Sequence, residues 1–160
     1  MKWDYEFDVV VIGSGNGALT SAICSHDGGA KTLVIEKSTQ FGGTSATSGG
    51  GVWIPNNRYA KAMNVDDSDQ DARDYINSVS PEGKIKDELV ETYLSEGPKM
   101  IDYLHENSQV KYRNLAHYPD YFPDNPGGKA GNRSMEPEPI KGTELGDDLA
   151  KLREQHPQTA

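Results

Sequence analysis

The sequence is poor in cysteine and in large apolar residues. Of its 160 residues, one is cysteine and 29 are leucine, isoleucine, valine or phenylalanine, whereas 17 are glycine and 9 are proline. A single cysteine excludes an internal disulfide bond and a metal site built from cysteines. Apolar neighbours at helical spacing predict that Cys24 is a small packing residue. The low apolar content brings the chain close to the composition of disordered proteins.

Long hydrophobic runs and basic clusters are also missing. No stretch approaches the roughly 18–20 apolar residues of a membrane-spanning helix, and the first residues are acidic where a secretory signal would be basic. No cluster of lysine and arginine is present to contact phosphate groups, which excludes nucleic-acid binding. We therefore expect a cytoplasmic protein. The histidines, His26, His105, His117 and His156, lack ligand spacing, so we expect surface positions and no metal site.

What the sequence does contain is distributed unevenly. Ten of the 29 large apolar residues fall in the first 36 positions, and seven fall from Asn107 to Ala160. Residues 1–65 carry five basic and five acidic side chains, whereas residues 66–160 carry eleven and twenty and account for the net charge of -9. The chain thus has a neutral, apolar beginning and an acidic section after it.

The first 36 residues have the pattern of a strand, a glycine-rich turn, a helix and a second strand. Residues 7–12 (FDVVVI) form a β-branched run typical of a strand buried on both faces of a parallel sheet. The turn GSGNGA, residues 13–18, ends this run, and apolar residues then recur at helical spacing up to Gly28 and Gly29. Residues 31–36 (KTLVIE) form the second strand. The pattern predicts an α/β fold with a Rossmann-like β-α-β unit and a parallel sheet.

The glycine turn has the residue types that dinucleotide binding requires. Gly13 would make the tight turn, Gly15 would let the backbone approach a pyrophosphate, and Ala18 would allow close packing of helix on strand. The helix N-terminus would offer free N–H groups to the phosphates. Glu36, at the end of the second strand, would accept hydrogen bonds from ribose hydroxyls and repel a 2′-phosphate. The alternative is a structural glycine turn in a protein that binds another ligand.

A second glycine-rich segment spans residues 41–57. Its glycines and small hydroxyl residues could lay backbone amides along an extended polar ligand. The alternative is a flexible linker, against which Trp53 and Ile54 argue, because such side chains are costly in a solvated linker.

Three amphipathic helices are expected in the acidic section. Ser68 would be the N-cap of the first helix, in a capping-box-like arrangement with Asp71. The second would run from about Lys86 to Glu96, and Gly97 with Pro98 would end it and begin the third. We assign no chemistry to these helices.

The segment that follows, residues 116–128, carries three aromatics and three prolines, and we call it the aromatic loop. Its composition favours a connector whose aromatics pack onto the helices; the alternative is a wall for a flat hydrophobic ligand. Lys129 and Arg133 could bind an anion, but a structural pairing of Arg133 with a carboxylate is favoured. The chain ends in a polar stretch, residues 151–160, with no capping element.

Several of these motifs resemble one family. DVVVIGSGNGA, the Glu36-Lys37 pair, FGGTSATSGGG and VWIPNN are similar to the N-terminal part of the fumarate reductase-like flavoproteins. VWIPNN and the PDY motif at residues 119–121 look most like the 3-ketosteroid Δ1-dehydrogenases. Residues 126–134 resemble the PGGxxGGRS segment of that family, with Asn132 in place of a glycine. The resemblance extends over nearly all of the chain.

The resemblance implies an FAD-dependent oxidoreductase that removes a proton from C2 and a hydride from C1 of a 3-ketosteroid or another flat hydrophobic substrate. Its electron acceptor is left unidentified by the sequence. FAD contacts are implied at the pyrophosphate, at the ribose, along the cofactor and near the flavin. In that order, the residues are Gly13, Ser14, Gly15, Asn16, Gly17 and Ala18; Glu36; Lys37, Gly42, Gly43, Thr44, Ser45 and Ala46; and Ser48, Gly49, Gly50 and Gly51.

The resemblance also implies an incomplete catalytic apparatus. Tyr121 would help a second tyrosine to remove the C2 proton, and Tyr118 would contact the steroid. Because family members are several times longer, we expect the second tyrosine and the groups that bind the C3 carbonyl to lie beyond Ala160, and the 160-residue chain to be an inactive N-terminal fragment. Residues 1–65 would begin the FAD-binding domain and residues 66–160 the substrate-side region. In such a fragment, we expect the packing partners of the acidic section to be absent from the chain.

Three alternatives stay open. The chain could be a non-catalytic dinucleotide-binding remnant. It could also come from a fumarate reductase-like enzyme or a 3-ketosteroid 4-dehydrogenase, which would share the first fifty residues.

Overall fold

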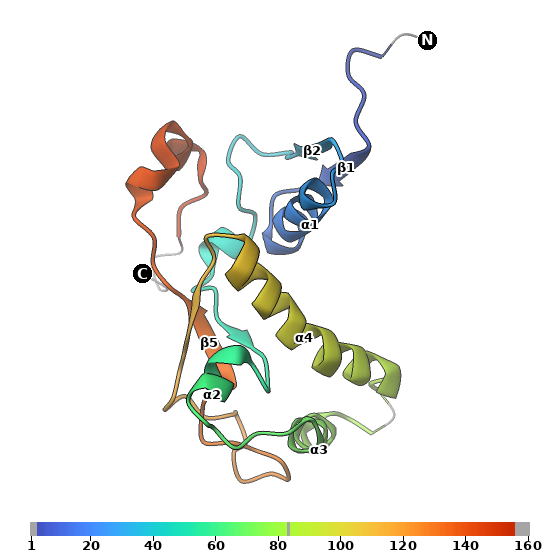
Figure 1. The fold of residues 1–160 in the computed structure, drawn as a ribbon, viewed down its shortest axis with the longest axis vertical. Coiled ribbons are helices and arrows are strands. Elements are labelled where there is room, and N and C mark those ends of the chain that lie inside the picture. Colours follow the sequence, from blue (N-terminus) through green and yellow to red (C-terminus); the bar gives the residue numbers. More distant parts are fainter. Residues whose placement is uncertain (1–2, 83, 156–160) are drawn as a thin grey trace. The chain divides into compact units, whose positions relative to one another are not determined.

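The computed structural model describes residues 3–82 and 84–155 and contains two compact units (Figure 1). Unit 1 combines the residues up to Gly50 with those from Ile140 onward, and unit 2 is Gly51–Pro139. These boundaries differ from the division expected at residue 65, because the segment after Ile140 returns to pair with Phe41. The functional division at residue 65 stays a prediction.

Unit 1 is built on a parallel β-α-β arrangement. Strand β1 (Val9–Ile12), helix α1 (Asn16–Asp27) and strand β2 (Thr32–Ile35) follow one another along the chain. The strands pair in parallel, with Val9 opposite Thr32 and Ile12 opposite Ile35, and α1 contacts both strands. The predicted α/β fold with a parallel sheet is therefore confirmed.

The expectation that the first strand is buried on both faces is wrong. Val10 is 51% exposed and Ile12 is 82% exposed, whereas Val9 and Val11 are half-buried. This alternation is typical of a strand that is covered on one face. Cys24 on α1 is likewise exposed and is not the packing residue that its spacing suggested.

The rest of unit 1 is irregular. A short 3₁₀ helix, η1, covers Ser45–Thr47, and a longer one, η2, covers Gly142–Lys151 with a break at Gly146. Beyond η2, the Phe41 N–H donates to the Lys151 carbonyl and the Arg153 N–H donates to the Phe41 carbonyl, both at 2.9 Å. The polar stretch after residue 150 thus contributes to unit 1. Residues 156–160, with His156, lie outside the described part.

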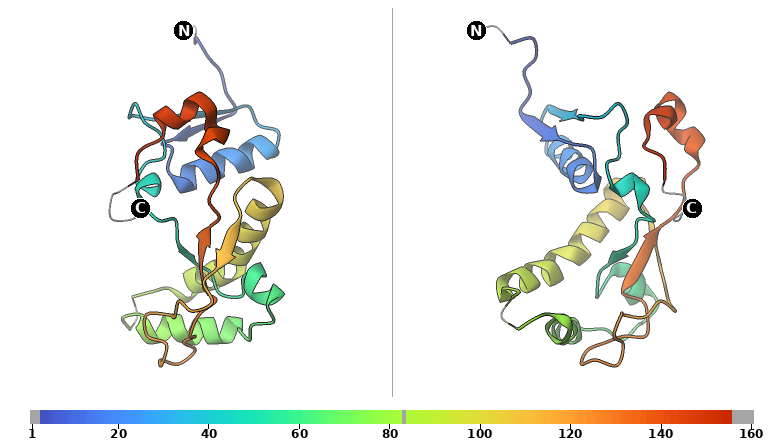
Figure 2. Two further views of the ribbon diagram at one scale, coloured as in Figure 1. Left: turned by 90° about the vertical axis from the view of Figure 1, so that its left-hand side faces the viewer. Right: turned by 180° about the vertical axis from the view of Figure 1, so that it is seen from behind.

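Unit 2 contains a three-stranded antiparallel sheet and three helices. Its sheet has the order β3-β5-β4, so the last strand along the chain lies in the middle (Figure 2). Strands of two to four residues are too short to show an alternating pattern, so the sequence did not predict this sheet. The elements are β3 (Val52–Trp53), α2 (Arg58–Ala62), α3 (Asp69–Val79), α4 (Asp87–Asn107), β4 (Tyr112–Asn114) and β5 (Ser134–Pro137).

The core of unit 2 has two clusters of buried side chains. Ile54, Ile101, Tyr112 and Met135 join the sheet to α4. Ala72, Val90 and Leu94 join α3 to α4. The expectation that the acidic section lacks packing partners is therefore wrong, because its helices find those partners within unit 2.

The helices of unit 2 follow the sequence pattern in one case and depart from it in another. Ser68 is the N-cap of α3, and its hydroxyl accepts the Asp71 N–H at 3.0 Å, as predicted. The predicted end at Pro98 is wrong, because α4 continues through it to Asn107. The absence of a side chain at Gly97 lets α4 approach Ile54, since a Cβ there would lie 3.2 Å from Ile54 Cδ1. Burial of this face offsets the roughly 3 kcal/mol cost of an interior proline.

In residues 3–82 and 84–155, none of the helices is both long enough and apolar enough to cross a membrane.

Candidate cofactor-binding site

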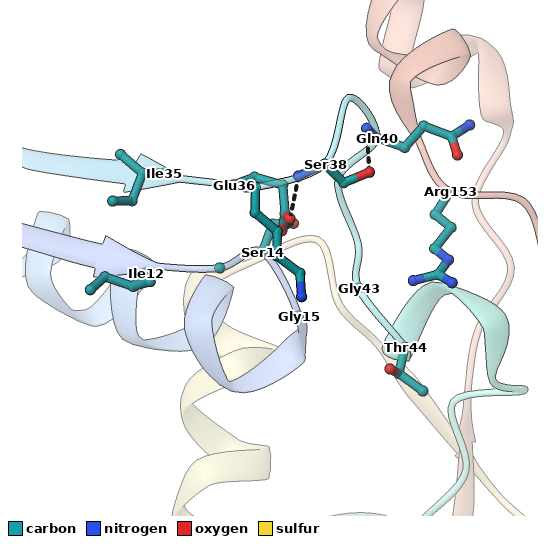
Figure 3. A pocket seen from close by; sticks show the side chains of 12 residues that line it. Ile12, Ser14, Gly15, Ile35, Glu36, Ser38, Gln40, Gly43, Thr44 and Arg153 are labelled. Carbon is teal, nitrogen blue, oxygen red and sulfur yellow. Dashed lines mark hydrogen bonds between the residues drawn. The ribbon is translucent and has the colours of Figure 1, made fainter.

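Unit 1 has a pocket of about 580 Å³ where β1 and β2 end and α1 begins (Figure 3). The crevice beyond the carboxyl ends of parallel strands is where open α/β sheets bind their ligands. The lining comes from the two strand ends, the glycine turn, the loop after β2 and one residue beyond η2. It consists of Ile12, Gly13, Ser14, Gly15, Ile35, Glu36, Lys37, Ser38, Gln40, Gly43, Thr44 and Arg153.

Two glycines shape the pocket floor. Gly13 has a φ of +97°, and its N–H donates to the Ile35 carbonyl at 2.7 Å, so the turn bends tightly and stays tied to β2. Gly43 has a φ of +56°, and a Cβ on it would lie 3.3 Å from Gly15 Cα. A side chain at Gly43 would therefore strain the backbone and press against the turn.

Ser14 and Glu36 connect the turn to the loop after β2. The buried Ser14 hydroxyl donates to Glu36 Oε2 at 2.5 Å and accepts the Gly42 N–H at 2.9 Å. The Ser38 N–H donates to Glu36 Oε1 at 2.9 Å. These hydrogen bonds, the one from Ser14 first, hold the pKa of Glu36 below its ordinary value. The carboxylate is thus ionised and oriented, and its remaining lone pairs can accept hydrogen bonds from ribose hydroxyls.

The N-terminus of α1 suits an anionic group. Gly15 is the N-cap and provides no side-chain cap, and the first turn has no acidic residue. One of the first amide groups, the Asn16 N–H, donates to the Ser45 hydroxyl at 2.9 Å. The positive end of the helix dipole is therefore not neutralised by an acidic side chain of α1. A carboxylate for the ribose and a helix N-terminus for the phosphates fit the dinucleotide part of FAD.

The structure brings together seven of the predicted cofactor residues and leaves the others outside the lining. The seven are Gly13, Ser14, Gly15, Glu36, Lys37, Gly43 and Thr44. Outside the lining are Asn16, Gly17, Ala18, Gly42, Ser45, Ala46, Ser48, Gly49, Gly50 and Gly51, the last of which belongs to unit 2. The sequence interpretation missed Ile12, Ile35, Ser38, Gln40 and Arg153. Position in the sequence could have indicated four of them: Ile12, Ile35 and Ser38 each adjoin a predicted residue, and Gln40 is two residues before Gly42. Arg153 is distant in sequence from all of them.

The predicted substrate-side residues lie in unit 2, on the aromatic loop. Tyr121 is 86% exposed, Tyr118 is 52% exposed and Phe122 is 58% exposed. The interpretation that these aromatics pack onto the helices is therefore wrong. These three aromatic side chains are exposed to solvent, whereas the backbone of the loop is hydrogen-bonded to α3. The Phe122 N–H, for example, donates to the Tyr75 hydroxyl at 3.3 Å.

Asp120 anchors the aromatic loop beside Tyr121. Its carboxylate accepts hydrogen bonds from Trp53 Nε1 at 2.6 Å, from an Arg133 guanidinium N–H at 2.9 Å and from the Lys129 N–H at 3.0 Å. The Asp120 N–H in turn donates to the Lys129 carbonyl. A carboxylate with this many donors is fixed in orientation and fixes the backbone that bears Tyr121.

Arg133 is the centre of this buried cluster. Its side chain is 1% exposed, and it pairs with Asp67 at 2.6 Å as well as with Asp120. Burial alone would lower the pKa of Arg133, but the two carboxylates outweigh burial and raise it. The structural role favoured for Arg133 is thus confirmed. Lys129 also forms an ion pair, with Asp71 at 2.9 Å, and is not free to bind an anion.

No group of three or more histidine, cysteine, aspartate or glutamate side chains within residues 3–82 and 84–155 could hold a metal ion. His26 and His117 are exposed, as expected. His105 is half-buried, and its Nδ1 lies 2.9 Å from the Tyr59 hydroxyl, so the expected surface position is wrong for this residue.

Comparisons with known proteins find similar sequences among dehydrogenases. The chain is 41% identical over 147 residues to the 3-oxosteroid 1-dehydrogenase of Mycobacterium tuberculosis, covering 92% of this chain and 26% of that protein. It is 39% identical over 144 residues to the 4-oxocyclohexanecarboxylate 2-dehydrogenase of Sinomonas cyclohexanicum, covering 90% of this chain and 25% of that protein.

A solved structure is similar in fold as well as in sequence. It is the 3-ketosteroid Δ1-dehydrogenase of Sterolibacterium denitrificans in complex with 1,4-androstadiene-3,17-dione, with a TM-score of 0.86 and 42% identity over 93% of this chain and 26% of that one. The chain thus spans about a quarter of the length of these relatives. The family model described as the FAD binding domain matches residues 8–159. The pocket chemistry and this match over nearly the whole sequence lead to one assignment, that the chain belongs to the FAD-binding domain family.

Proposed function

We propose that this chain provides the FAD-dinucleotide site of an oxidoreductase that introduces a double bond between C1 and C2 of a 3-ketosteroid. The observation that carries the proposal is the 41% identity to a 3-oxosteroid 1-dehydrogenase over 92% of the chain. The pocket supports it, since its carboxylate and helix N-terminus suit an adenine dinucleotide. The β1-α1-β2 arrangement would be the Rossmann-like start of the FAD-binding domain, and we place the enzyme in the cytoplasm.

In this proposal the cofactor contacts follow the pocket. Glu36 would bind the ribose hydroxyls, and the turn from Gly13 to Gly15 would bind the pyrophosphate. The other predicted cofactor residues, from Asn16 to Ala18, at Lys37, from Gly42 to Ala46 and from Ser48 to Gly51, would continue along FAD. Bound FAD would supply the acceptor, at its N5 atom, for the hydride that leaves C1.

Two tyrosines of the aromatic loop would act on the steroid. Tyr121 would share in removing the proton from C2 with a second tyrosine, and Tyr118 would form part of the substrate wall. A phenol is a weak base at neutral pH and needs a partner to move a proton. A solvent-exposed hydroxyl on a backbone anchored by Asp120 supports this role, because the loop does not need to reorder before substrate binds.

The test is steroid-dependent reduction of an artificial electron acceptor by the protein expressed from its complete reading frame. Tyr121→Phe keeps the ring and removes the hydroxyl, and we expect a loss of roughly 100-fold or more in kcat, the scale of general acid–base catalysis. Tyr5→Phe is the matched control, since Tyr5 is an exposed tyrosine of unit 1. Unchanged turnover in Tyr121→Phe would remove this residue from the mechanism.

A second candidate function has its own support. The 39% identity to 4-oxocyclohexanecarboxylate 2-dehydrogenase is close to the identity found for the steroid enzyme. The second candidate is therefore desaturation of a small cyclic ketone that carries a carboxylate. The same assay with the two substrates in parallel separates the candidates: turnover of the steroid alone supports the first, and turnover of 4-oxocyclohexanecarboxylate alone replaces it with the second.

A further inference from the structure

Arg153 reaches the pocket from a part of the chain that showed no binding motif. It follows η2 and is held by the backbone hydrogen bonds that join Phe41 to Lys151 and Arg153. Leu152, between them, packs near Gly42, since a Cβ on that glycine would lie 3.2 Å from Leu152 Cδ1. The position of Arg153 is therefore set by backbone hydrogen bonds and by the packing of Leu152.

The side chain of Arg153 is directed toward the loop that approaches the glycine turn. Figure 3 shows the Arg153 guanidinium extending toward Thr44, on the side of the pocket away from Ile12 and Ile35. Thr44 follows Gly43, which closely approaches Gly15, the N-cap of α1. Arg153 and Gly15, the N-cap of α1, thus line the same pocket. A guanidinium and a helix N-terminus both favour an anion.

The other arginines show that this one is unusual. The sequence has five arginines and a net charge of -9. Four of them pair with carboxylates: Arg58 with Asp102 and Glu106, Arg73 with Glu91, Arg113 with Glu136, and Arg133 with Asp67 and Asp120. No carboxylate among the described residues pairs with Arg153. In so acidic a chain, an arginine that lines a pocket without an acidic partner is available for an anionic ligand.

We infer that Arg153 binds the pyrophosphate of FAD, opposite the N-terminus of α1. The inference rests on FAD as the cofactor and is independent of which substrate is oxidised. A guanidinium offers two parallel N–H groups to phosphate oxygens, which a lysine cannot do. Arg153 would therefore add both charge and orientation to the contacts of the glycine turn.

The test measures ligand affinity, not turnover. The protein from the complete reading frame is prepared without FAD and titrated with FAD, ADP and adenosine, as wild type and as Arg153→Gln and Arg153→Lys. For Arg153→Gln we expect the Kd for FAD and for ADP to rise roughly 10-fold, the scale of a hydrogen bond to a charged group, and the Kd for adenosine to stay the same. Arg153→Lys should recover part of the affinity, and added salt should narrow the difference from wild type.

Lys151→Gln is the matched control, because it removes the same charge from the same segment while Lys151 is 64% exposed and pairs with Asp148. Its affinities should equal those of wild type. Wild-type affinity for ADP in Arg153→Gln, or an equal loss for adenosine, would overturn the inference. A protein that binds FAD with this dependence on Arg153 and does not oxidise a steroid would refute the proposed function and leave the inference intact.

Discussion

The two units differ in what their buried side chains do. All the buried hydrophobic side chains of the described residues belong to unit 2: Ile54, Ala60, Ala72, Tyr75, Val90, Leu94, Ile101, Leu104, Tyr112 and Met135. In unit 1, the buried side chain is the serine that orients Glu36. Unit 2 thus has the packed core and unit 1 has the pocket, although the apolar runs of the sequence are in unit 1.

This difference shows that apolar content does not locate a core. The apolar residues of unit 1 are gathered in short strands with one covered face, so Val10, Ile12 and Ile35 remain exposed. The acidic section places its few apolar residues on one side of each helix, where they meet. Apolar side chains that converge from several elements are buried, whereas those of a sheet with one covered face stay partly exposed.

The largest expected effect concerns the buried charges of unit 2. Arg133→Met leaves two buried carboxylates without their cation, so we expect a loss of about 3–5 kcal/mol in the free energy of unfolding. The control is Arg113→Met, which breaks an ion pair whose arginine is 56% exposed and should cost less than about 1 kcal/mol. Chemical denaturation measures both. Equal losses for the two variants would contradict a core in unit 2 that depends on this cluster.

A second prediction compares the same residue type in the two units. Ile101→Ala in unit 2 should cost about 2–5 kcal/mol, because Ile101 is fully buried. Ile12→Ala in unit 1 should change the free energy by less than about 0.5 kcal/mol, because Ile12 is 82% exposed. In a Trp3→Phe background, Trp53 is the remaining tryptophan and its fluorescence reports on unit 2. A large loss from Ile12→Ala would show that unit 1 has a core of its own.

The smallest effect concerns the pH response of the pocket. Because the pKa of Glu36 is lowered on folding, its favourable contribution is present above the unfolded-state pKa and is lost as the pH falls through the folded-state value. Ser14→Ala removes the main cause, so the pKa of Glu36 should rise toward its ordinary value. Carboxyl ¹³C NMR measures this titration. Ser21→Ala is the control, since that hydroxyl bonds the Gly17 carbonyl, and an unmoved pKa in Ser14→Ala would exclude the proposed cause.

The parts that the sequence predicted well are those that local physics determines. The glycine turn and the two apolar runs predicted the parallel arrangement of β1 and β2, and Ser68 predicted the start of α3. Each of these two predictions, the β1–β2 pairing and the start of α3, depends on residues close together in the chain. The predicted strands were longer than β1 and β2 by one or two residues at an end.

The parts that failed depend on contacts between distant residues. Pro98 should end a helix, yet packing of Gly97 on Ile54 continues it. The short strands of unit 2 pair only because the chain returns after the aromatic loop. Arg153 lines the pocket through backbone hydrogen bonds to Phe41, and such bonds have no side-chain signature in the sequence.

The pairing of Phe41 with the segment around Leu152 has a consequence for the order of folding. Unit 2 is continuous in the sequence and lies between the two parts of unit 1. During synthesis, all of unit 2 therefore leaves the ribosome before Arg153 does, and it can fold first. Once unit 2 has folded, the two parts of unit 1 are joined by a compact body and no longer by a long flexible loop. This changes the entropic cost of bringing Phe41 and Leu152 together. The pocket rim is thus completed last, after the part of the chain that contains the hydrophobic core.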